Sequence, residues 1–149
     1  MKKLKRTAAG MTAALMLGMS CAALAADNIS VVLNGAKVSF PNAKPVIYED
    51  RTLIPVRAVF EELGCYVDWD SANRMAVIGN DEKTILIPID SKSMQLYDIA
   101  TDTSSDIKLD VPAMIINDST MIPLRAVGEA LGAKVDWRQE TKTVLINMD

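Results

Sequence analysis

The sequence predicts an α+β domain in which antiparallel β hairpins pack on two short helices, built from two copies of an (extended)-α-β-β unit. The first observation is an internal repeat: TLIPVRAVFEELGCYVDW, from Thr52 to Trp69, returns as TMIPLRAVGEALGAKVDW, from Thr120 to Trp137, with 12 of 18 positions identical at a constant offset of 68 residues. The second is a change of hydrophobic period, from helical to alternating, inside each copy. An internal repeat usually represents one supersecondary unit used more than once. We therefore expect repeats over residues 29–90 and 91–149.

The first 25 residues have the features of a secretory signal peptide. A basic segment over residues 1–6 precedes a mostly apolar stretch, and Ala23 and Ala25 form the small-x-small pattern that precedes cleavage. We expect cleavage after Ala25 and a secreted or extracellular cell-envelope location. A membrane anchor needs about 20 apolar residues, which this short segment does not supply, and a lipid attached to Cys21 would need a Leu three positions upstream, where Gly18 stands.

The mature chain, residues 26–149, is predicted to be one acidic domain. Four of the 16 Lys and Arg lie in the first 25 residues and none of the 19 Asp and Glu does, so 12 basic against 19 acidic side chains leave a net charge of −7. Binding to nucleic acid or anionic lipid depends on Lys and Arg that neutralise negative charge. We expect no nucleic-acid partner and no membrane span after cleavage.

The first element of the mature chain is a predicted hairpin. Residues 29–33 and 37–40 are the two predicted arms, and they flank Asn34-Gly35, a dipeptide that favours the type I′ turn.

Each repeat then predicts a short helix. Pro55 and Pro123 suit a first helical turn, and Gly64 and Gly132 suit the left-handed residue that ends a helix. Between them, apolar side chains recur at helical spacing and predict one buried stripe per helix. Two pairs at i,i+4 flank these stripes, Arg57 with Glu61 and Arg125 with Glu129. We interpret both as structural ion pairs or as hydrogen bonds to the neighbouring strand.

A strand with alternating burial is predicted after each glycine. Trp69 and Trp137 fall in the inward phase, so we expect both to pack in the core; the alternative is that they stack on a sugar ring. Apolar runs over residues 75–78 and 143–146 complete a hairpin in each copy, and residues 84–89 predict a further strand. Three tyrosines, Tyr48, Tyr66 and Tyr97, are better placed for outward recognition.

The segment 91–110 is polar and acidic. We expect a strand near residues 94–97, a mobile loop around residues 101–106 and a strand entering Pro112. Aspartates recur every four residues at Asp98, Asp102, Asp106 and Asp110, but like charges at that spacing oppose a helix. A solvated acidic loop is the favoured interpretation, with a calcium site as the alternative. Asp68, Asp70 and Asn73 resemble a calcium loop that lacks its glycine and distal Glu.

These motifs resemble the copper amine oxidase N-terminal-like domain, also called the stalk domain, of exported bacterial proteins. The resemblance rests on Leu-Asn-Gly, Pro-Val-Ile, Arg-Thr-Leu-Ile-Pro-Val-Arg, Glu-Glu-Leu-Gly and Val-Asp-Trp-Asp, and it covers residues 29–148. The second copy departs from the first at Ser119 and Arg138, where the first has Arg51 and Asp70. Whatever Arg51 and Asp70 do is therefore not required twice.

The resemblance does not imply amine oxidase activity. Copper amine oxidases hold copper with histidines and carry a tyrosine-derived quinone in a separate catalytic domain, and this chain contains no His. Thioethers could bind Cu(I), but the methionines of the mature chain are scattered along the sequence. We interpret most of them as side chains that fill gaps in the core. Cys65 is the only Cys of the mature chain and aligns with Ala133, which indicates a small buried side chain rather than a nucleophile. We expect no cofactor and no metal.

The sequence thus predicts a non-catalytic exported binding or scaffolding module with an unidentified ligand. Its partner would be a cell-wall component, a polysaccharide or a protein, and self-association into a surface or filament is one alternative. A second alternative is a small hydrolase using Glu61, Glu62, Asp68 or Asp70. Functional residues are expected where the copies differ, and the candidate surface consists of Arg51, Tyr66, Asp70, Tyr97, Asp102 and Asp106.

Overall fold

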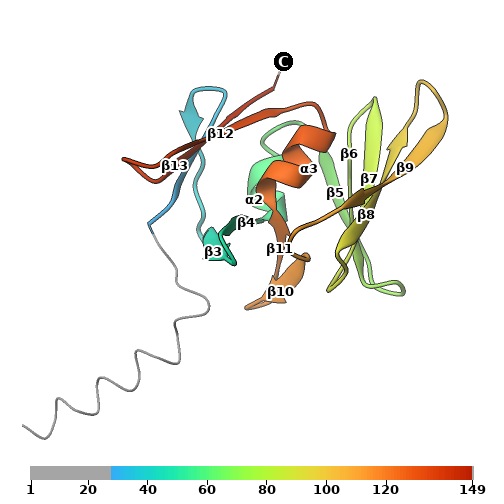
Figure 1. The fold of residues 1–149 in the computed structure, drawn as a ribbon, viewed down its shortest axis with the longest axis horizontal. Helices are drawn as coiled ribbons and strands as arrows, with labels where there is room; N and C mark the ends of the chain where they lie inside the picture. The colour runs from blue at the N-terminus through green and yellow to red at the C-terminus, as the bar shows by residue number, and fades with distance from the viewer. Residues whose placement is uncertain (1–27, 149) are drawn as a thin grey trace, which may run out of the picture.

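A computed structural model describes residues 28–148; the segment 1–25, with Cys21, lies outside the described residues. The prediction of an α+β fold is confirmed, because three mostly antiparallel sheets surround two short helices (Figure 1). No helix in the described part of the chain is long and apolar enough to cross a membrane.

The first sheet joins the two ends of the described chain. Its strands are ordered β12-β13-β1-β2, and its one parallel pair is β1 with β13, in which Ser30 lies opposite Thr143 and Leu33 opposite Ile146. The turn between β1 and β2 has positive φ at both Asn34 (48°) and Gly35 (88°), as the type I′ prediction requires. The strands are β1 (Ser30–Leu33), β2 (Ala36–Lys37), β12 (Lys134–Arg138) and β13 (Thr143–Asn147).

The second sheet lies below the helices in Figure 1 and combines the two extended segments that lead into them. Its order is β10-β11-β4-β3, and β11 pairs with β4 so that Ile122 lies opposite Ile54. Both Ile side chains are fully buried. The strands are β3 (Val46–Tyr48), β4 (Arg51–Pro55), β10 (Met114–Ile116) and β11 (Ser119–Pro123).

The third sheet is an antiparallel meander of five strands in sequence order, β5-β6-β7-β8-β9. The predicted strands over residues 84–89 and 94–97 are present in it as β7 and β8. Pro88 is the last residue of β7, where its missing N–H interrupts little of the ladder. The strands are β5 (Tyr66–Asp70), β6 (Met75–Gly79), β7 (Lys83–Pro88), β8 (Ser93–Asp98) and β9 (Thr103–Lys108).

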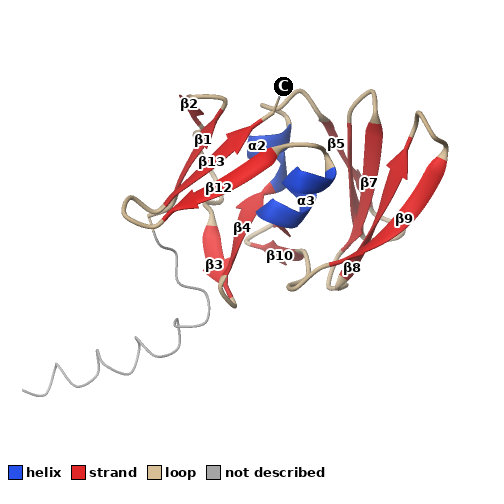
Figure 2. Cartoon of the chain, turned by 45° about the horizontal axis from the view of Figure 1, so that its top comes forward, coloured by secondary structure: helices blue, strands red, loops and turns tan. Residues whose placement is uncertain are grey.

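Two helices occupy the centre of the molecule, between the first and third sheets (Figure 2). Helix α2 (Val56–Phe60) begins directly after Pro55 and α3 (Leu124–Ala130) directly after Pro123. The chain leaves both helical turns at a glycine with positive φ, 85° at Gly64 and 97° at Gly132. The same order of elements therefore occurs twice, over residues 51–79 and 119–147. In each segment a strand ends at a proline, a helix follows, and a hairpin comes last.

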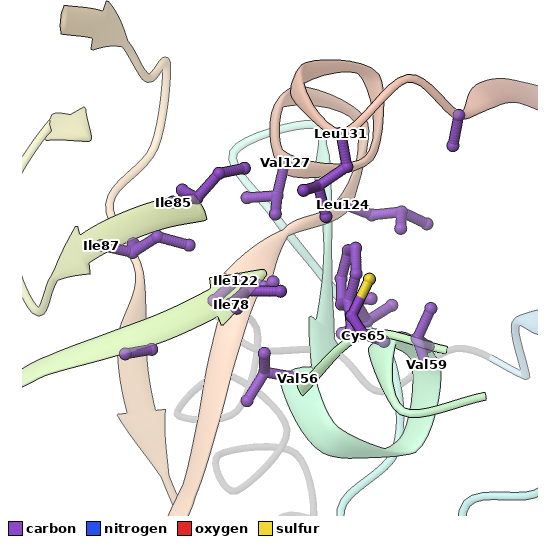
Figure 3. Packing of buried hydrophobic residues seen from close by; sticks show 14 of the residues in the cluster. Val56, Val59, Cys65, Ile78, Ile85, Ile87, Ile122, Leu124, Val127 and Leu131 are labelled. Carbon is purple, nitrogen blue, oxygen red and sulfur yellow. The ribbon is translucent and has the colours of Figure 1, made fainter. Parts of the chain in front are cut away.

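The main core lies where the helices meet the sheets (Figure 3). The predicted helix stripes are buried, with Val59, Phe60 and Val127 at 0% exposure, and Cys65 lies among them at 5%. Inward side chains of the five-stranded sheet, including Ile78 and Ile85, pack against the same cluster. A separate small cluster, Val46, Leu53, Val111 and Met121, lies on the other side of the second sheet.

Three sequence-based expectations need correction. Residues 103–108 form strand β9 and not a mobile loop, because they pair along their whole length with β8. No strand enters Pro112: β9 ends at Lys108, and the chain reaches β10 through an isolated bridge at Ala113. Trp69 has the predicted phase, opposite buried Ala76, but it is 40% exposed because it lies near the end of an edge strand, beyond the core.

Candidate binding face

The outer face of the five-stranded sheet carries the tyrosines that the sequence placed outward. The strand registers align Tyr66, Gly79, Thr84 and Tyr97 in one row across β5, β6, β7 and β8. Directly paired residues share one face of an antiparallel sheet. Tyr66 is 46% exposed and Tyr97 is 37% exposed. The helices lie on the opposite face, so no described element covers this row (Figures 1 and 2).

Tyr66 lies flat on the sheet because its neighbour in the row is a glycine. A Cβ atom built on Gly79 would lie 2.5 Å from the Tyr66 hydroxyl and 2.6 Å from its ring carbon Cζ, so the ring occupies the space that a side chain would fill. The hydroxyl reaches the next strand, 3.0 Å from Thr84 Oγ1. The ring is thus held at both ends and presents its other side to solvent.

Tyr97 is held by the turn that follows its strand. Its hydroxyl donates a hydrogen bond to Asp102 Oδ1, and Asp102 occupies the turn with a positive φ of 52°. This hydrogen bond, desolvation and the nearby charge of Asp98 raise the pKa of Tyr97. The phenol therefore remains protonated at neutral pH and remains a donor to Asp102.

The neighbouring row on the same face mixes polar and apolar side chains. The registers align Asp68, Val77, Leu86, Gln95 and Asp106. Val77 and Leu86 are half-buried, whereas the three polar side chains are exposed. We call the two rows the tyrosine face, defined by Tyr66, Asp68, Val77, Gly79, Thr84, Leu86, Gln95, Tyr97 and Asp106.

The corresponding face of the first sheet is different in character. Lys134, 68 positions after Tyr66, is exposed there, with its Nζ 4.0 Å from Asp136 Oδ2. Arg138 follows on the same strand. The tyrosine face is therefore specific to the five-stranded sheet and is not a property of both ends of the molecule.

Four of the six residues predicted for the candidate surface lie together here. Tyr66, Tyr97 and Asp106 belong to the tyrosine face, and Asp102 borders it through Tyr97. Sequence reasoning missed Thr84 and Gly79. An isolated glycine at the end of an apolar strand is a signal for close approach by another group, and it could have indicated Gly79.

Arg51, the fifth predicted residue, lies elsewhere and joins two distant segments. Its Nε and Nη2 lie 2.9 and 2.7 Å from Asp110 Oδ2, which ties the start of β4 to the segment after β9. The residues 68 positions away from these two are Ser119 and Asn42, which cannot form such an ion pair. Both side chains of the pair are well exposed, so its contribution to stability is about 0–1 kcal/mol.

Asp70, the sixth, shapes a turn. Its Oδ2 accepts from Asn73 Nδ2 at 2.9 Å and its Oδ1 accepts from the Asn73 backbone N–H at 3.1 Å. These hydrogen bonds, the side-chain one first, lower the pKa of Asp70. The arrangement closes the turn between β5 and β6.

The acidic segment is largely exposed, as expected, but it forms strands β8 and β9 and the turn between them and not a loop, which corrects part of the favoured interpretation. Asp98 lies in β8 with Oδ2 3.8 Å from Lys83 Nζ, Asp102 accepts from Tyr97, and Asp110 pairs with Arg51. Three of its four aspartates are thus paired with protein groups at separate places. Within residues 28–148, no group of three or more His, Cys, Asp or Glu could hold a metal ion.

The two helix ion pairs have different roles. Arg57 Nη1 lies 2.9 Å from Glu61 Oε2, and Arg125 Nη1 lies 3.2 Å from Glu129 Oε2. Arg125 Nη1 also donates to the backbone carbonyl of Val135 at 2.9 Å. The second pair therefore ties α3 to β12, whereas the first lies on the helix surface.

Two open grooves lie beside the helices, one next to each tryptophan. The larger, of about 770 Å³, is lined by Trp137, Arg125 and Arg51; the smaller, of about 650 Å³, is lined by Trp69, Arg57 and Ser119. Most of their lining positions correspond at the offset of 68 residues. Trp137 packs partly against the core and donates from Nε1 to Gln139 Oε1 at 2.8 Å, so its core prediction is partly confirmed.

The carboxylates named for a hydrolase do not converge. Glu61 and Glu62 line the smaller groove, Asp68 lies on the tyrosine face, and Asp70 belongs to its turn. A general acid at neutral pH needs a raised pKa, and Asp70 has a lowered one.

The donor set does not fit copper. The chain has no His, and Cys65 is buried with its pKa raised by desolvation, which opposes the thiolate that binds metals. Among the methionines, Met94 and Met121 are buried in separate clusters. Tyr48, also predicted to face outward, packs partly against the small cluster.

A family model described as the copper amine oxidase N-terminal domain matches residues 32–146. The chain belongs to the copper amine oxidase N-terminal domain family. This family is a non-catalytic, stalk-type module, and the match covers every strand from β2 to β12. A comparison of this chain with curated proteins found no match, and a comparison with solved structures found none either.

Proposed function

We propose that this chain is a non-catalytic exported binding or scaffolding module of the cell envelope or secreted fraction, and that the tyrosine face contacts its partner. One observation carries the proposal: Tyr66 and Tyr97 lie in one row of an uncovered sheet face, each held by a hydrogen bond. Tyrosines are enriched at binding surfaces because they supply large contact area at a low cost in conformational entropy.

A binding experiment tests this function directly. The mature chain, starting at Ala26, is immobilised and exposed to cell-wall fragments, polysaccharides and secreted proteins of the producing bacterium. We expect retention of one class, lost in Tyr66→Ala and kept in Lys134→Ala, the variant at the corresponding position of the first sheet. Retention of nothing above background, or equal loss in both variants, would contradict the proposal.

Export is part of the proposal and has its own measurement. The basic, apolar and small-x-small segments of residues 1–25 support it. N-terminal sequencing of the protein recovered from the culture medium or the envelope should begin at Ala26. A mature chain that still begins at Met1 would contradict it.

We also propose that the domain consists of two copies of an (extended)-α-β-β unit, residues 29–90 and 91–149. The repeated sequence, the matching element order and the corresponding grooves support this division. Each copy would then contribute strands to a sheet of the other. Strand β1 of the first copy pairs with β13 of the second, and β8 of the second lies in a sheet with β5 and β6 of the first.

Self-assembly through strand edges is a second candidate. Strand β9 is an edge of the five-stranded sheet, six residues long and almost entirely exposed. Its Asp106 and Lys108 are charged residues of the kind that protect edges from pairing, which favours the binding module. Light scattering at high concentration distinguishes the two, since only self-assembly gives a mass that grows with concentration.

A further inference from the structure

We propose that the tyrosine face is a stacking platform for a neutral polysaccharide chain. This inference rests on the proposed function and names the ligand class of the same surface. Its central observation is the ring of Tyr66, which lies flat over Gly79 and exposes one side to solvent.

A flat, fixed ring suits a sugar better than it suits most other ligands. The C–H groups on one face of a pyranose ring can contact an aromatic face, and a ring whose orientation is set in advance makes that contact at a lower cost in conformational entropy. Gly79 provides the space and Thr84 Oγ1, 3.0 Å from the hydroxyl, sets the orientation. Little side-chain freedom remains to be lost on binding.

The length of the face suits a chain rather than a single sugar. The Tyr66 ring lies over β6, and Tyr97 belongs to β8, two strand spacings or about 10 Å away. Thr84 lies between the two rings in the same row. A linear oligosaccharide laid across the strands would contact both aromatic rings.

The polar groups of the second row suit hydroxyl groups. Asp68 and Asp106 are exposed acceptors, and Gln95 between them in the sheet is both donor and acceptor. Neither row contains Lys or Arg, and the one cation that the register of the described strands places nearby on this side of the sheet is Lys108, in the next row at the edge strand β9. The two rows themselves therefore offer no partner for phosphate, sulfate or uronate groups. The negative charges of Asp68 and Asp106 favour a neutral glycan over an anionic one.

A peptide ligand fits this surface less well. Extended peptides bind sheets by adding a strand to an edge, where backbone N–H and C=O groups are free. The tyrosine face is the flat surface of a sheet, and its central strands β6, β7 and β8 are paired on both sides. The surface offers side chains only.

The test measures depletion of the mature chain by insoluble chitin and cellulose, and titration with the soluble hexasaccharides of both. We expect binding to at least one, with little dependence on salt. Tyr66→Ala and Tyr97→Ala should each weaken it about tenfold or more, since each removes an aromatic contact. Lys134→Ala is the matched control and should leave binding unchanged.

Two further variants separate stacking from folding. Tyr66→Phe keeps the ring and removes the Thr84 hydrogen bond, so it should retain most of the binding. Gly79→Ala keeps every ligand-contacting side chain but displaces the ring, so it should weaken binding while a thermal scan shows a folded protein. Equal binding by Gly79→Ala and the native chain would overturn the platform.

The outcomes also separate this inference from the proposed function. Binding to a protein or peptide that is lost in Tyr66→Ala, with no binding to either polysaccharide, overturns the glycan and leaves the binding module intact. Binding only to anionic polymers, abolished by salt, also overturns the glycan. No binding to any fraction of the envelope or the medium overturns both.

Discussion

Residues at corresponding positions of the two repeated segments face different demands. Phe60 is fully buried, yet 68 positions later stands Gly128, where a Cβ atom would lie 3.0 Å from Val135 Cγ2. Helix α2 fills the core at this position with the Phe60 ring, whereas α3 brings its backbone at Gly128 close to strand β12. Gly64 and Gly132, by contrast, serve one purpose, since both have positive φ and open space around the missing side chain.

This open space makes Gly132 a clean test of backbone strain. Gly132→Ala should lower the free energy of unfolding by about 1–2 kcal/mol, because a Cβ is disfavoured at a left-handed φ. Gly132→Asn should cost less, since Asn tolerates that region. Urea denaturation measures both, and a neutral Gly132→Ala would show that the turn does not need its φ of 97°.

Cys65 gives a prediction about pH. Burial raises the pKa of its thiol, so iodoacetamide should label folded protein of residues 26–149 far more slowly than the same protein in denaturant at the same pH. The folded pKa lies above the unfolded value of about 8.5. The thiol's contribution to stability is therefore complete below that value and is lost as the pH rises through the folded pKa.

A Cys65→Ala variant provides the control, because Ala133 already occupies the corresponding position. In Cys65→Ala, the unfolding free energy should not show the decrease at alkaline pH that ionisation of the thiol causes in the native chain. Rapid labelling of the native chain, at the rate found in denaturant, would contradict the burial of this side chain.

At the scale of elements, the helices are short and depend on what holds them to the sheets. Helix α2 has five residues and α3 has seven, too few to persist in water on propensity alone. Buried apolar stripes hold both helices, and α3 has an additional polar tie to β12 through Arg125 and Val135.

The matched pair Arg57 and Arg125 tests that tie. Arg125→Ala leaves the Val135 carbonyl without its side-chain donor and should cost about 1–3 kcal/mol, whereas Arg57→Ala removes only a surface pair worth about 0–1 kcal/mol. Chemical denaturation of the two variants gives the comparison. Equal losses would mean that the hydrogen bond to Val135 adds nothing to the ion pair.

Local patterns predicted the elements well where one residue determines the backbone. Pro55 and Pro123 mark where the helices begin, and Asn34-Gly35 marks its turn. They failed for β9, whose sequence TSSDIK has weak strand propensity and becomes a strand only because β8 offers a partner. The exposure of Trp69 was missed for a related reason, since alternation gives the phase of a strand but not where the core beneath it ends.

The candidate surface depends on relations that single segments do not contain. Tyr66 and Tyr97 were predicted to face outward, but their alignment in one row follows from the register of four strands. The flat position of Tyr66 needs Gly79 on the neighbouring strand. Period and propensity carry no information about such neighbours.

At the scale of the whole molecule, the first sheet depends on the last strand of the chain. β13 lies between β12 and β1, and its Val144 and Ile146 are buried in the main core. A chain that stops after Lys142 should show no cooperative thermal unfolding, because β12 loses its partner strand and β1 keeps only the two-residue strand β2. Circular dichroism measures this.

A chain that stops after Asn147 is the control for this truncation. It keeps β13 and loses the hydrogen bond from Met148 N–H to Asn34 Oδ1, so it should melt cooperatively with a small decrease in Tm. A cooperative transition in the shorter chain would show that β1 and β12 do not need β13.

The parallel pairing of β1 with β13 also has a consequence for the time course of folding. The hydrogen bond between Met148 and Asn34 spans 114 positions, and contacts between segments this far apart slow the folding of a domain. During synthesis, β1 and the two-residue strand β2 emerge early, but β1 lacks its partner on the other side until β13 is added. The domain therefore stays incompletely folded until β13 has been synthesised, and the arrival of this strand sets the moment at which the domain can close.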